Sequence, residues 1–329
     1  MPVSRLRLAR RLVLGAVVVL ALAGVMHAAG AAEQVFVAVT AIVDHPALEA
    51  CRDGIRGALK DAGYEDGKNL KFIYENAGGD LATAVKIADR FARAKPSVIV
   101  PISTPSARTV VAATIDIPVV FTAVTDPLGA NLVRDMDRPG GNVAGVSDLA
   151  PVTKQIELIK QITPSARTIG VLFNPHEMNS YTIVHLMKTT AMGVNMTIIE
   201  APAPNSSDVQ AAAKSLVGKA DVIFVPTDNT IVSMLDVVIE VGVENRIPIY
   251  AGDIDAVKSG AIAAIGFDYY SVGWQTGNVV VRILKGERAG AIPVEVVDET
   301  RLYVNPAAAA KMGVTIPEGV ISRADKVLR

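Results

Sequence analysis

From Val35 onward the chain alternates short apolar runs with stretches that repeat apolar residues at helical spacing. The runs are rich in β-branched residues, which is typical of buried strands. The predicted strands are Val35–Ile42, Leu70–Tyr74, Ser97–Ile102 and Pro118–Ala123, and the predicted helices between and after them are Ala47–Ala62, Leu81–Ala94 and Pro105–Thr114. This order predicts an α/β fold, in which helices cover both faces of a parallel sheet.

The same alternation recurs in the second half of the chain, at an offset of about 125–133 residues. The segments that correspond to the four strands are "TIGVLFNP", "NMTIIEAP", "KADVIFVPTDNT" and "NRIPIYAGD". Any two doubly wound domains share part of this pattern, but the matched Ile-Pro before the fourth strand favours a true repeat. The prediction is therefore two doubly wound, Rossmann-like lobes with parallel sheets, joined by a hinge of several strands.

The chain continues beyond the second lobe with a further strand and helix and a late strand, so it is predicted to cross between the lobes more than once. The candidate crossings are Gly145–Leu149, Ala251–Asp253 and Val296–Tyr303. The expected segments are a signal peptide (1–32), an N-terminal lobe (33–147), a C-terminal lobe (148–251), a return to the N-terminal lobe (252–295), and a hinge crossing with the C-terminal segment (296–329).

The first 32 residues have the layout of a secretory signal peptide, with four arginines followed by the apolar run Leu12–Val25 and small residues up to Ala32. The alternative is an uncleaved membrane anchor, but the run is short for a span. Cleavage would leave 28 Lys and Arg against 33 Asp and Glu, a net charge near −5. The single cysteine, Cys51, cannot form an intramolecular disulfide and lies too far from the apolar run to carry a lipid. We therefore expect a free, monomeric protein of a bacterial-type periplasm.

Polar residues and prolines follow the predicted strands of the first lobe. "STPS" (103–106) follows the third strand, "TDP" (125–127) the fourth, and "DHP" (44–46) the first. Carboxyl ends of parallel strands meet at one edge of a sheet, where helix N-termini favour anions. The hydroxyls of Thr104, Ser106 and Thr125 would add donors for a carboxylate there. For a single site of this kind, the simpler interpretation is a helix N-cap.

The corresponding strand ends of the second lobe, together with the trailing unit, carry amides and carboxylates as well as a hydroxyl. They are Asn174, Glu177, Thr227, Asp228, Asn229, Asp253 and Asp268. A buried ammonium group needs an ionised acceptor. Hydroxyls and amides on one lobe that face carboxylates on the other would suit a zwitterion. The alternative is that Asp228 and Asp268 are helix caps or hinge residues.

From about Val35 to its end, the sequence resembles the tryptophan/tyrosine-type substrate-binding proteins of ABC importers, a branch of the type I periplasmic binding proteins. The matching segments are "VTAIVDHPALEACRDG", "TPSA", "VVFTAVTDPLGANLV", "PGGNVAGVSD", "KQIELIK", "VPTDNTIVS" and "GFDYYSVGWQTG". The resemblance implies two lobes joined by a three-stranded hinge that close on an amino acid, and an ABC permease as partner. The residues it assigns are Ser106, Ala123 and Thr125 for the carboxylate, Asp228 and Asp253 for the ammonium, and His45 for the side-chain pocket.

Other classes of function find little support in the sequence. No metal-ligand spacing, nucleophile elbow, P-loop or dinucleotide fingerprint is present, so we expect no metal, no cofactor and no catalysis. No basic cluster indicates nucleic-acid binding. A sugar-repressor-like regulator would need a DNA-binding segment where the signal peptide lies. Aromatic residues near the strand ends favour an aromatic or large apolar ligand. A branched-chain amino acid, a short peptide, another small carboxylate and a sensory role remain the alternatives.

Overall fold

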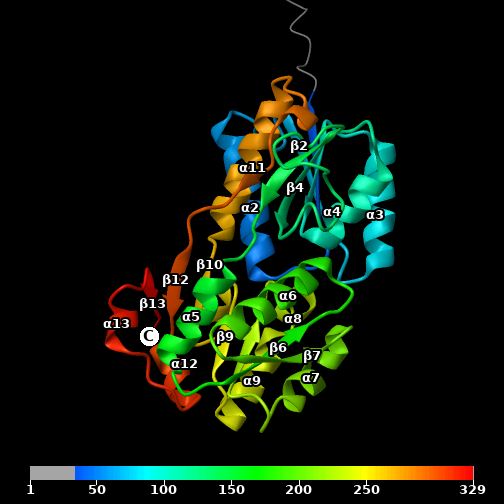
Figure 1. The fold of residues 1–329 in the computed structure, drawn as a ribbon. Helices are drawn as coiled ribbons and strands as arrows, with labels where there is room; N and C mark the ends of the chain where they lie inside the picture. Colours follow the sequence, from blue (N-terminus) through cyan, green and yellow to red (C-terminus); the bar gives the residue numbers. More distant parts are fainter. Residues whose placement is uncertain (1–33, 329) are drawn as a thin grey trace, which may run out of the picture.

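The computed structural model describes residues 34–328, which form two α/β lobes stacked end to end (Figure 1). Each lobe is built on one twisted, mostly parallel sheet, of six strands in the first lobe and seven in the second. The prediction of two parallel-sheet lobes is confirmed. The expected signal peptide lies outside the described residues. Within residues 34–328, no helix is long and apolar enough to cross a membrane.

The sheet of the first lobe has the strand order β11-β5-β4-β3-β1-β2, and every pair in it is parallel. Its strands are β1 (Val35–Ala41), β2 (Leu70–Asn76), β3 (Val98–Ile102), β4 (Val119–Val124), β5 (Val143–Ser147) and β11 (Glu295–Val296). Its helices are α2 (Pro46–Asp61), α3 (Leu81–Ala94), α4 (Thr104–Ala113) and α11 (Tyr269–Leu284), with the short 3-10 helix η2 (Ala289–Ala291). Because side chains alternate along a strand, Val37 and Val39 pack toward α2 and α11, whereas Ala38 packs toward α3 and α4.

The sheet of the second lobe has the order β13-β12-β10-β9-β8-β6-β7, and only β12 against β10 is antiparallel. Its strands are β6 (Thr168–Phe173), β7 (Thr197–Pro202), β8 (Val222–Val225), β9 (Ile249–Ala251), β10 (Ala263–Gly266), β12 (Arg301–Val304) and β13 (Lys326–Val327). Its helices are α5 (Val152–Ile162), α6 (Met178–Gly193), η1 (Ser206–Asp208), α7 (Val209–Ser215), α8 (Asn229–Val232), α9 (Leu235–Asn245), α10 (Asp255–Lys258), α12 (Pro306–Lys311) and α13 (Glu318–Ile321).

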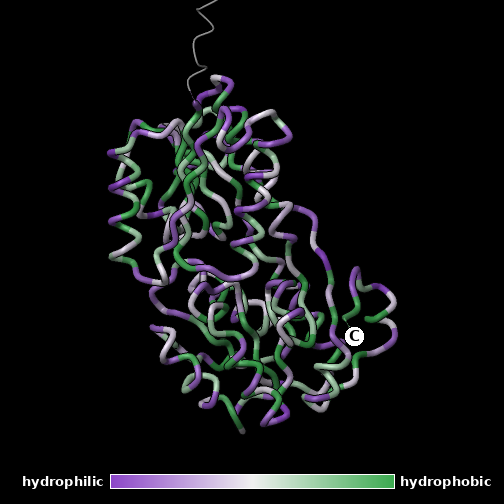
Figure 2. Tube along the Cα trace, turned by 180° about the vertical axis from the view of Figure 1, so that it is seen from behind, coloured by the Kyte–Doolittle hydropathy of each residue, from purple (hydrophilic) through white to green (hydrophobic). Residues whose placement is uncertain are grey.

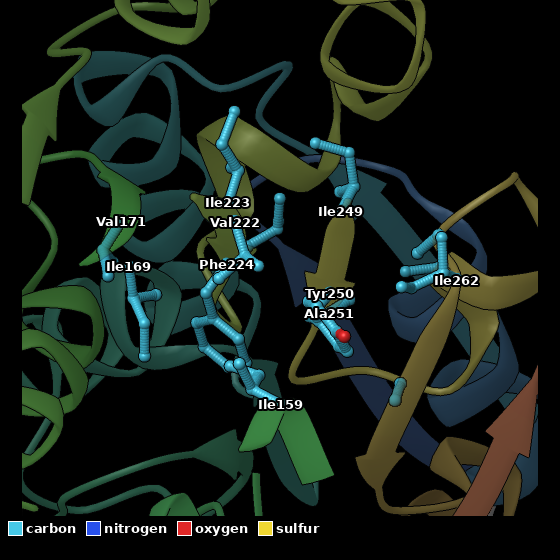
Figure 3. Close-up of a cluster of buried hydrophobic side chains, with 14 of the residues drawn as sticks. Ile159, Ile169, Val171, Val222, Ile223, Phe224, Ile249, Tyr250, Ala251 and Ile262 are labelled. Atoms are coloured by element: carbon cyan, nitrogen blue, oxygen red, sulfur yellow. The ribbon is translucent and has the colours of Figure 1, made fainter. Parts of the chain in front are cut away.

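The core of the second lobe consists of the central strands and the helices packed against them, and Figure 3 shows a part of it that includes Ile159 of α5. Ile169, Val222 and Phe224 come from neighbouring strands and are buried together. Tyr250 is also fully buried, and its hydroxyl lies 2.6 Å from the hydroxyl of Thr163, so its polar end is paired. Figure 2 shows from behind that hydrophobic segments concentrate inside each lobe and that the outer helices carry many hydrophilic residues.

The chain crosses between the lobes three times, at residues 148–151, 267–268 and 297–300. The second crossing differs from the expected return at residue 252. The strand β10 pairs with β9 and therefore stays in the second lobe, and only Phe267 and the helix after it join the first. The polar turn around Asp253 resembles a crossing in the sequence, but it leads into the four-residue helix α10 and back into the same sheet.

Helix α11 is attached to the first lobe by a very close contact with α2. A Cβ atom on Gly273 would lie 1.9 Å from the carbonyl oxygen of Cys51, and one on Gly54 would lie 2.1 Å from that of Tyr270. The two backbones approach this closely because neither glycine has a side chain. This contact holds the start of α11, and with it Tyr269, over the carboxyl edge of the first sheet.

Candidate functional site

A narrow cavity lies between the lobes, at the carboxyl ends of the strands of both sheets. The space between atoms there, with the opening toward solvent included, is about 360 Å³. The first lobe contributes His45, Ala47, Leu48, Ala123, Thr125 and Tyr269, the second contributes Asn179, Thr227, Asn229, Val232 and Asp253, and the first crossing contributes Asp148. Strand-end cavities between two domains are usual sites for small molecules.

The strand ends of the first lobe have an unusual backbone at this edge. Ser103, after β3, has φ of 78°, and Ala123, near the end of β4, has φ of 52°. The pairing of β4 with β5 also shifts register between Phe121 and Val124. Left-handed backbone in non-glycine residues costs free energy and is concentrated at functional sites. The backbone at the ends of β3 and β4 is therefore of the kind found at ligand-binding sites.

The residues predicted for the carboxylate divide into two groups. Ala123 and Thr125 line the cavity. Ser106 and Thr104 are buried at the start of α4, but they are not among the residues that line it. Their hydroxyls have no hydrogen-bond partner within the described chain, and neither does that of Ser103. Buried hydroxyls without a partner are costly, so this segment retains hydrogen-bonding capacity directly beside the cavity.

Asp228, which was expected to bind the ammonium, has its hydrogen-bond partners within the second lobe and is not among the residues that line the cavity. It is fully buried, and both of its oxygens accept hydrogen bonds within the lobe. Oδ2 accepts from the backbone N of Asn174 at 2.6 Å and from Oγ of Ser180 at 2.5 Å, and Oδ1 accepts from the backbone N of Ile231 at 2.9 Å. The alternative of a helix cap is therefore correct, because Asp228 caps α8 and ties it to β6 and α6. Burial, and next the negative charge of Glu177, raise the pKa of Asp228.

Two further predicted residues also lie outside the cavity. Asn174 uses its amide within the second lobe, where Nδ2 donates to Thr230 at 2.8 Å and Oδ1 accepts from the backbone N of His176 at 2.9 Å. Asp268 is exposed and caps α11, accepting from the backbone N of Tyr270 at 3.1 Å. Asn174 thus accepts from a nearby turn and donates to the start of α8, and Asp268 accepts at the start of α11. The interpretation of Asp268 as a cap is the one the structure supports.

Asp148 is a cavity residue that the sequence analysis missed. It follows β5 directly, as Thr125 follows β4, but its segment had been assigned to the crossing. Tyr269 donates to Oδ2 of Asp148 at 2.6 Å, and Oδ1 has no partner within the described chain although the residue is 2% exposed. Burial raises the pKa of Asp148. The signal that could have identified it is its position at the carboxyl end of a fully buried strand.

Asp253 is the second carboxylate of the cavity and follows β9. Its Oδ1 accepts from the backbone N of Asp255 at 2.8 Å. Burial, and next the negative charge of Asp255, raise its pKa to about 7. Burial also raises the pKa of Tyr269, and the negative charges of Asp148 and Asp253 raise it further. The Tyr269 hydroxyl donates to Asp148, and a Cβ atom on Gly266, where β10 ends, would lie 3.4 Å from Cα of Asp253. Both carboxylates therefore lie on the side of the cavity next to the crossings.

His45 lies directly before α2, where it lines the cavity. Burial lowers its pKa to about 4, so the imidazole is neutral at physiological pH. Its Nδ1 atom has no hydrogen-bond partner within residues 34–328. Among these residues, no lysine or arginine lines the cavity. The lining therefore holds two carboxylates and no cation, and a ligand that brings a positive charge would relieve their burial cost.

No cluster of metal-ligand side chains occurs among the described residues. The cavity lies between two lobes, with carboxylates beside the crossings and hydroxyls at the opposite strand ends. These features define the class of a ligand-binding protein. The chain belongs to the family of ABC transporter substrate-binding proteins, which it matches over residues 36–328. It is 43% identical to the tyrosine-binding protein of Clostridioides difficile (strain R20291) over 269 residues, or 82% of this chain and 78% of that protein.

Two solved structures of similar proteins, one with a ligand and one without, can be compared with this chain. The ABC domain from Streptococcus pneumonia in complex with L-Trp is 35% identical, with a TM-score of 0.87, over 90% of this chain and 100% of that one. A ligand-free, open substrate-binding protein with adhesive properties from Clostridium difficile is 38% identical, but its TM-score is 0.68, over 89% of this chain and 99% of that one. At similar identity, this chain thus resembles the complex more closely than the open form.

Proposed function

We propose that this protein captures a free amino acid with an aromatic side chain between its two lobes. The observation that carries the proposal is the pair of buried carboxylates, Asp148 and Asp253, on one side of a cavity whose described lining contains no cation. The ligand ammonium would lie between them. Its carboxylate would lie toward Thr125 and the strained ends of β3 and β4, and its side chain toward His45 and the small apolar residues at the start of α2.

The proposal includes the cellular role that family membership supports. The mature protein is exported after removal of residues 1–32, remains in the periplasm as a monomer, and delivers its ligand to an ABC permease in the inner membrane. It has no catalytic activity. The relatives that bind tyrosine and L-Trp support the aromatic assignment. A branched-chain amino acid, another small carboxylate and a sensory role are the competing possibilities.

The direct test is titration calorimetry on residues 33–329, after refolding to remove ligand that co-purifies. We expect L-Trp or L-Tyr to bind one per chain, and more tightly than L-Leu or L-Val. The N-acetyl and the amide derivatives of the best ligand are the controls for its two ends. Each derivative should bind at least about a hundredfold more weakly, because a buried charge then loses its partner. Tight binding of the N-acetyl derivative would contradict the proposal.

Affinity is also expected to depend on pH. An ammonium binds the ionised form of Asp253, whose pKa is about 7 in the ligand-free protein. Affinity should therefore fall about 10- to 30-fold between pH 7.5 and pH 5.5, with proton release on binding at the lower pH. His45, with a pKa of about 4, stays neutral through this window.

The stability of the ligand-free protein should depend on pH in the opposite sense, and be lower at pH 7.5 than at pH 5.5 as far as Asp253 is concerned. The pKa of Asp253 is raised on folding, so its contribution to stability is lost as the pH rises toward 7.

Calorimetry in two buffers of different ionisation enthalpy measures both the affinity and the proton release. Asp253→Asn is the control, and its remaining affinity should vary less with pH. A wild-type affinity that is constant over the window would contradict the assignment of Asp253 to the ammonium.

A further inference from the structure

One buried side-chain amide in the lining of the cavity is held in a fixed orientation. Asn179 is the second residue of α6, is 3% exposed and lines the cavity. Its Nδ2 atom donates to the carbonyl oxygen of Thr227 at 2.9 Å and to Oε2 of Glu177 at 3.1 Å. Both of these partners can only accept a hydrogen bond. The NH₂ group must therefore face them, and Oδ1 takes the opposite direction.

The Oδ1 atom of Asn179 has no hydrogen-bond partner within the described chain. It is a carbonyl oxygen, so it can only accept. The hydroxyl of Thr227, which is also without a partner there, differs because it can donate or accept and so imposes no requirement on a ligand. Asn179 is thus a neutral group of the cavity whose free oxygen can be paired only by a hydrogen-bond donor of the ligand.

Glu177 makes this orientation rigid. Besides Asn179, its Oε2 atom accepts from the backbone N of Asn229 at 3.1 Å, and its Oε1 atom accepts from the backbone N and the hydroxyl of Thr230 at 3.0 and 2.8 Å. The carboxylate is buried and spans from α6 to the start of α8. The Glu177 side chain is fixed in position by these hydrogen bonds. It therefore also fixes the orientation of the Asn179 amide, whose Nδ2 atom donates to it.

Asn179 lies on the side of the cavity proposed for the ligand side chain. Its partner Glu177 also accepts a hydrogen bond from Nδ2 of Asn229, and Asn229 lines the cavity together with His45. Asp148 and Asp253 instead follow β5 and β9, next to the crossings. A ligand with its ammonium between these carboxylates and its side chain toward His45 therefore brings the tip of that side chain toward Asn179.

We propose that Asn179 selects ligands by accepting a hydrogen bond from the ligand side chain, which rests on the amino-acid capture proposed above. The chemical class that fits is an aromatic amino acid with an N–H or O–H group on the ring system, such as an indole or a phenol. A ring without such a donor leaves Oδ1 buried and unpaired. Sites that are built to pair with a polar group of the substrate reject analogues that lack it, because the buried partner is then stranded.

The test compares ligands that differ only in the donor. L-Tyr is paired with L-Phe, and L-Trp is paired with 3-benzothienyl-L-alanine, in which sulfur replaces the indole N–H at nearly constant shape. Calorimetry on the wild-type protein should show that the donor ligand binds about 10- to 100-fold more tightly in at least one pair. In Asn179→Ala this ratio should fall to about twofold or less, because both members of the pair then lack the acceptor.

Two further variants keep the result interpretable. Asn245→Ala removes an exposed asparagine at the end of α9, at the opposite edge of the sheet, and should keep the wild-type ratio. Asn179→Ser keeps a polar residue at the helix start but cannot reach the ligand, and it should lose the ratio as Asn179→Ala does, even if the alanine variant folds poorly. Thermal unfolding without ligand monitors folding of each variant.

The outcomes separate this inference from the function on which it rests. Equal affinity for both members of each pair in the wild-type protein, or a ratio that persists in both Asn179 variants, would overturn the role of Asn179 and leave amino-acid capture intact. Failure of all four ligands to bind would overturn the proposed function itself and this inference with it.

Discussion

Replacing Asp148 or Asp253 by asparagine is expected to weaken amino-acid binding by about 3–5 kcal/mol, or more than a hundredfold. Each substitution keeps the size of the side chain but removes a negative charge that faces the ligand ammonium. In Asp148→Asn the amide oxygen could still accept the hydrogen bond from Tyr269 that Asp148 accepts at 2.6 Å. Titration calorimetry with the best ligand of the panel measures the loss.

The same variants should not destabilise the ligand-free protein. Burial raises the pKa of both carboxylates, which means that their ionised forms are unfavourable in the folded state. A neutral amide removes this cost, so the midpoint of thermal unfolding at about pH 8 should stay the same or rise. Lower affinity together with unchanged stability is the signature of a ligand-binding residue. Variants that lose stability and keep their affinity would show that the carboxylates are structural.

Asp228→Asn is the matched comparison, because Asp228 is equally buried and acidic but has all its partners within the second lobe. An amide would place an NH₂ group against a backbone N–H of Asn174 or Ile231. We therefore expect a loss of stability of at least about 1–2 kcal/mol, as for a broken helix cap. A fully stable Asp228→Asn protein that cannot bind ligand would instead restore Asp228 as the ammonium site.

Gly273→Ala is expected to destabilise the protein by about 3 kcal/mol or more, at the upper end of the range for overpacking. The new methyl group would lie 1.9 Å from the carbonyl oxygen of Cys51, 2.6 Å from its carbonyl carbon and 2.8 Å from its Cα. These are backbone atoms of α2, so no side-chain rotation can relieve the contact, and the two helices must move apart. Urea unfolding followed by circular dichroism measures the change in the free energy of unfolding.

The displacement should also reach the ligand site, because α11 begins with Tyr269, the hydrogen-bond donor to Asp148. Gly193→Ala is the control for introducing alanine into a helix. A Cβ atom there meets nothing within 4 Å, and alanine favours the helical conformation, so stability should be unchanged or higher by up to about 1 kcal/mol. A Gly273→Ala protein as stable as this control would show that α2 and α11 can separate without cost.

Much of the fold follows from local pattern. The strand-like runs and the helical spacing predicted β1, β3 and α3 to within about two residues, and the repeat predicted two lobes. These features could be found because a strand buried on both faces must be apolar along its length, and an amphipathic helix must repeat near 3.6 residues. The position of the second crossing could not be found in this way, since β10 is apolar in either lobe and only its pairing with β9 assigns it.

The gathering of polar residues at the carboxyl ends of the strands could be predicted from the order of residues alone, because parallel strands place those ends at one edge. Which acidic residue is available to a ligand could not. Asp228 and Asp148 both follow apolar strands, but the folded chain surrounds Asp228 with three donors and leaves one oxygen of Asp148 unpaired beside the cavity. The same is true of Asn179, whose free oxygen is defined only by the partners of its nitrogen. A buried polar atom becomes a ligand contact through the hydrogen bonds that its neighbours do not satisfy, and these neighbours come from segments far apart in the chain.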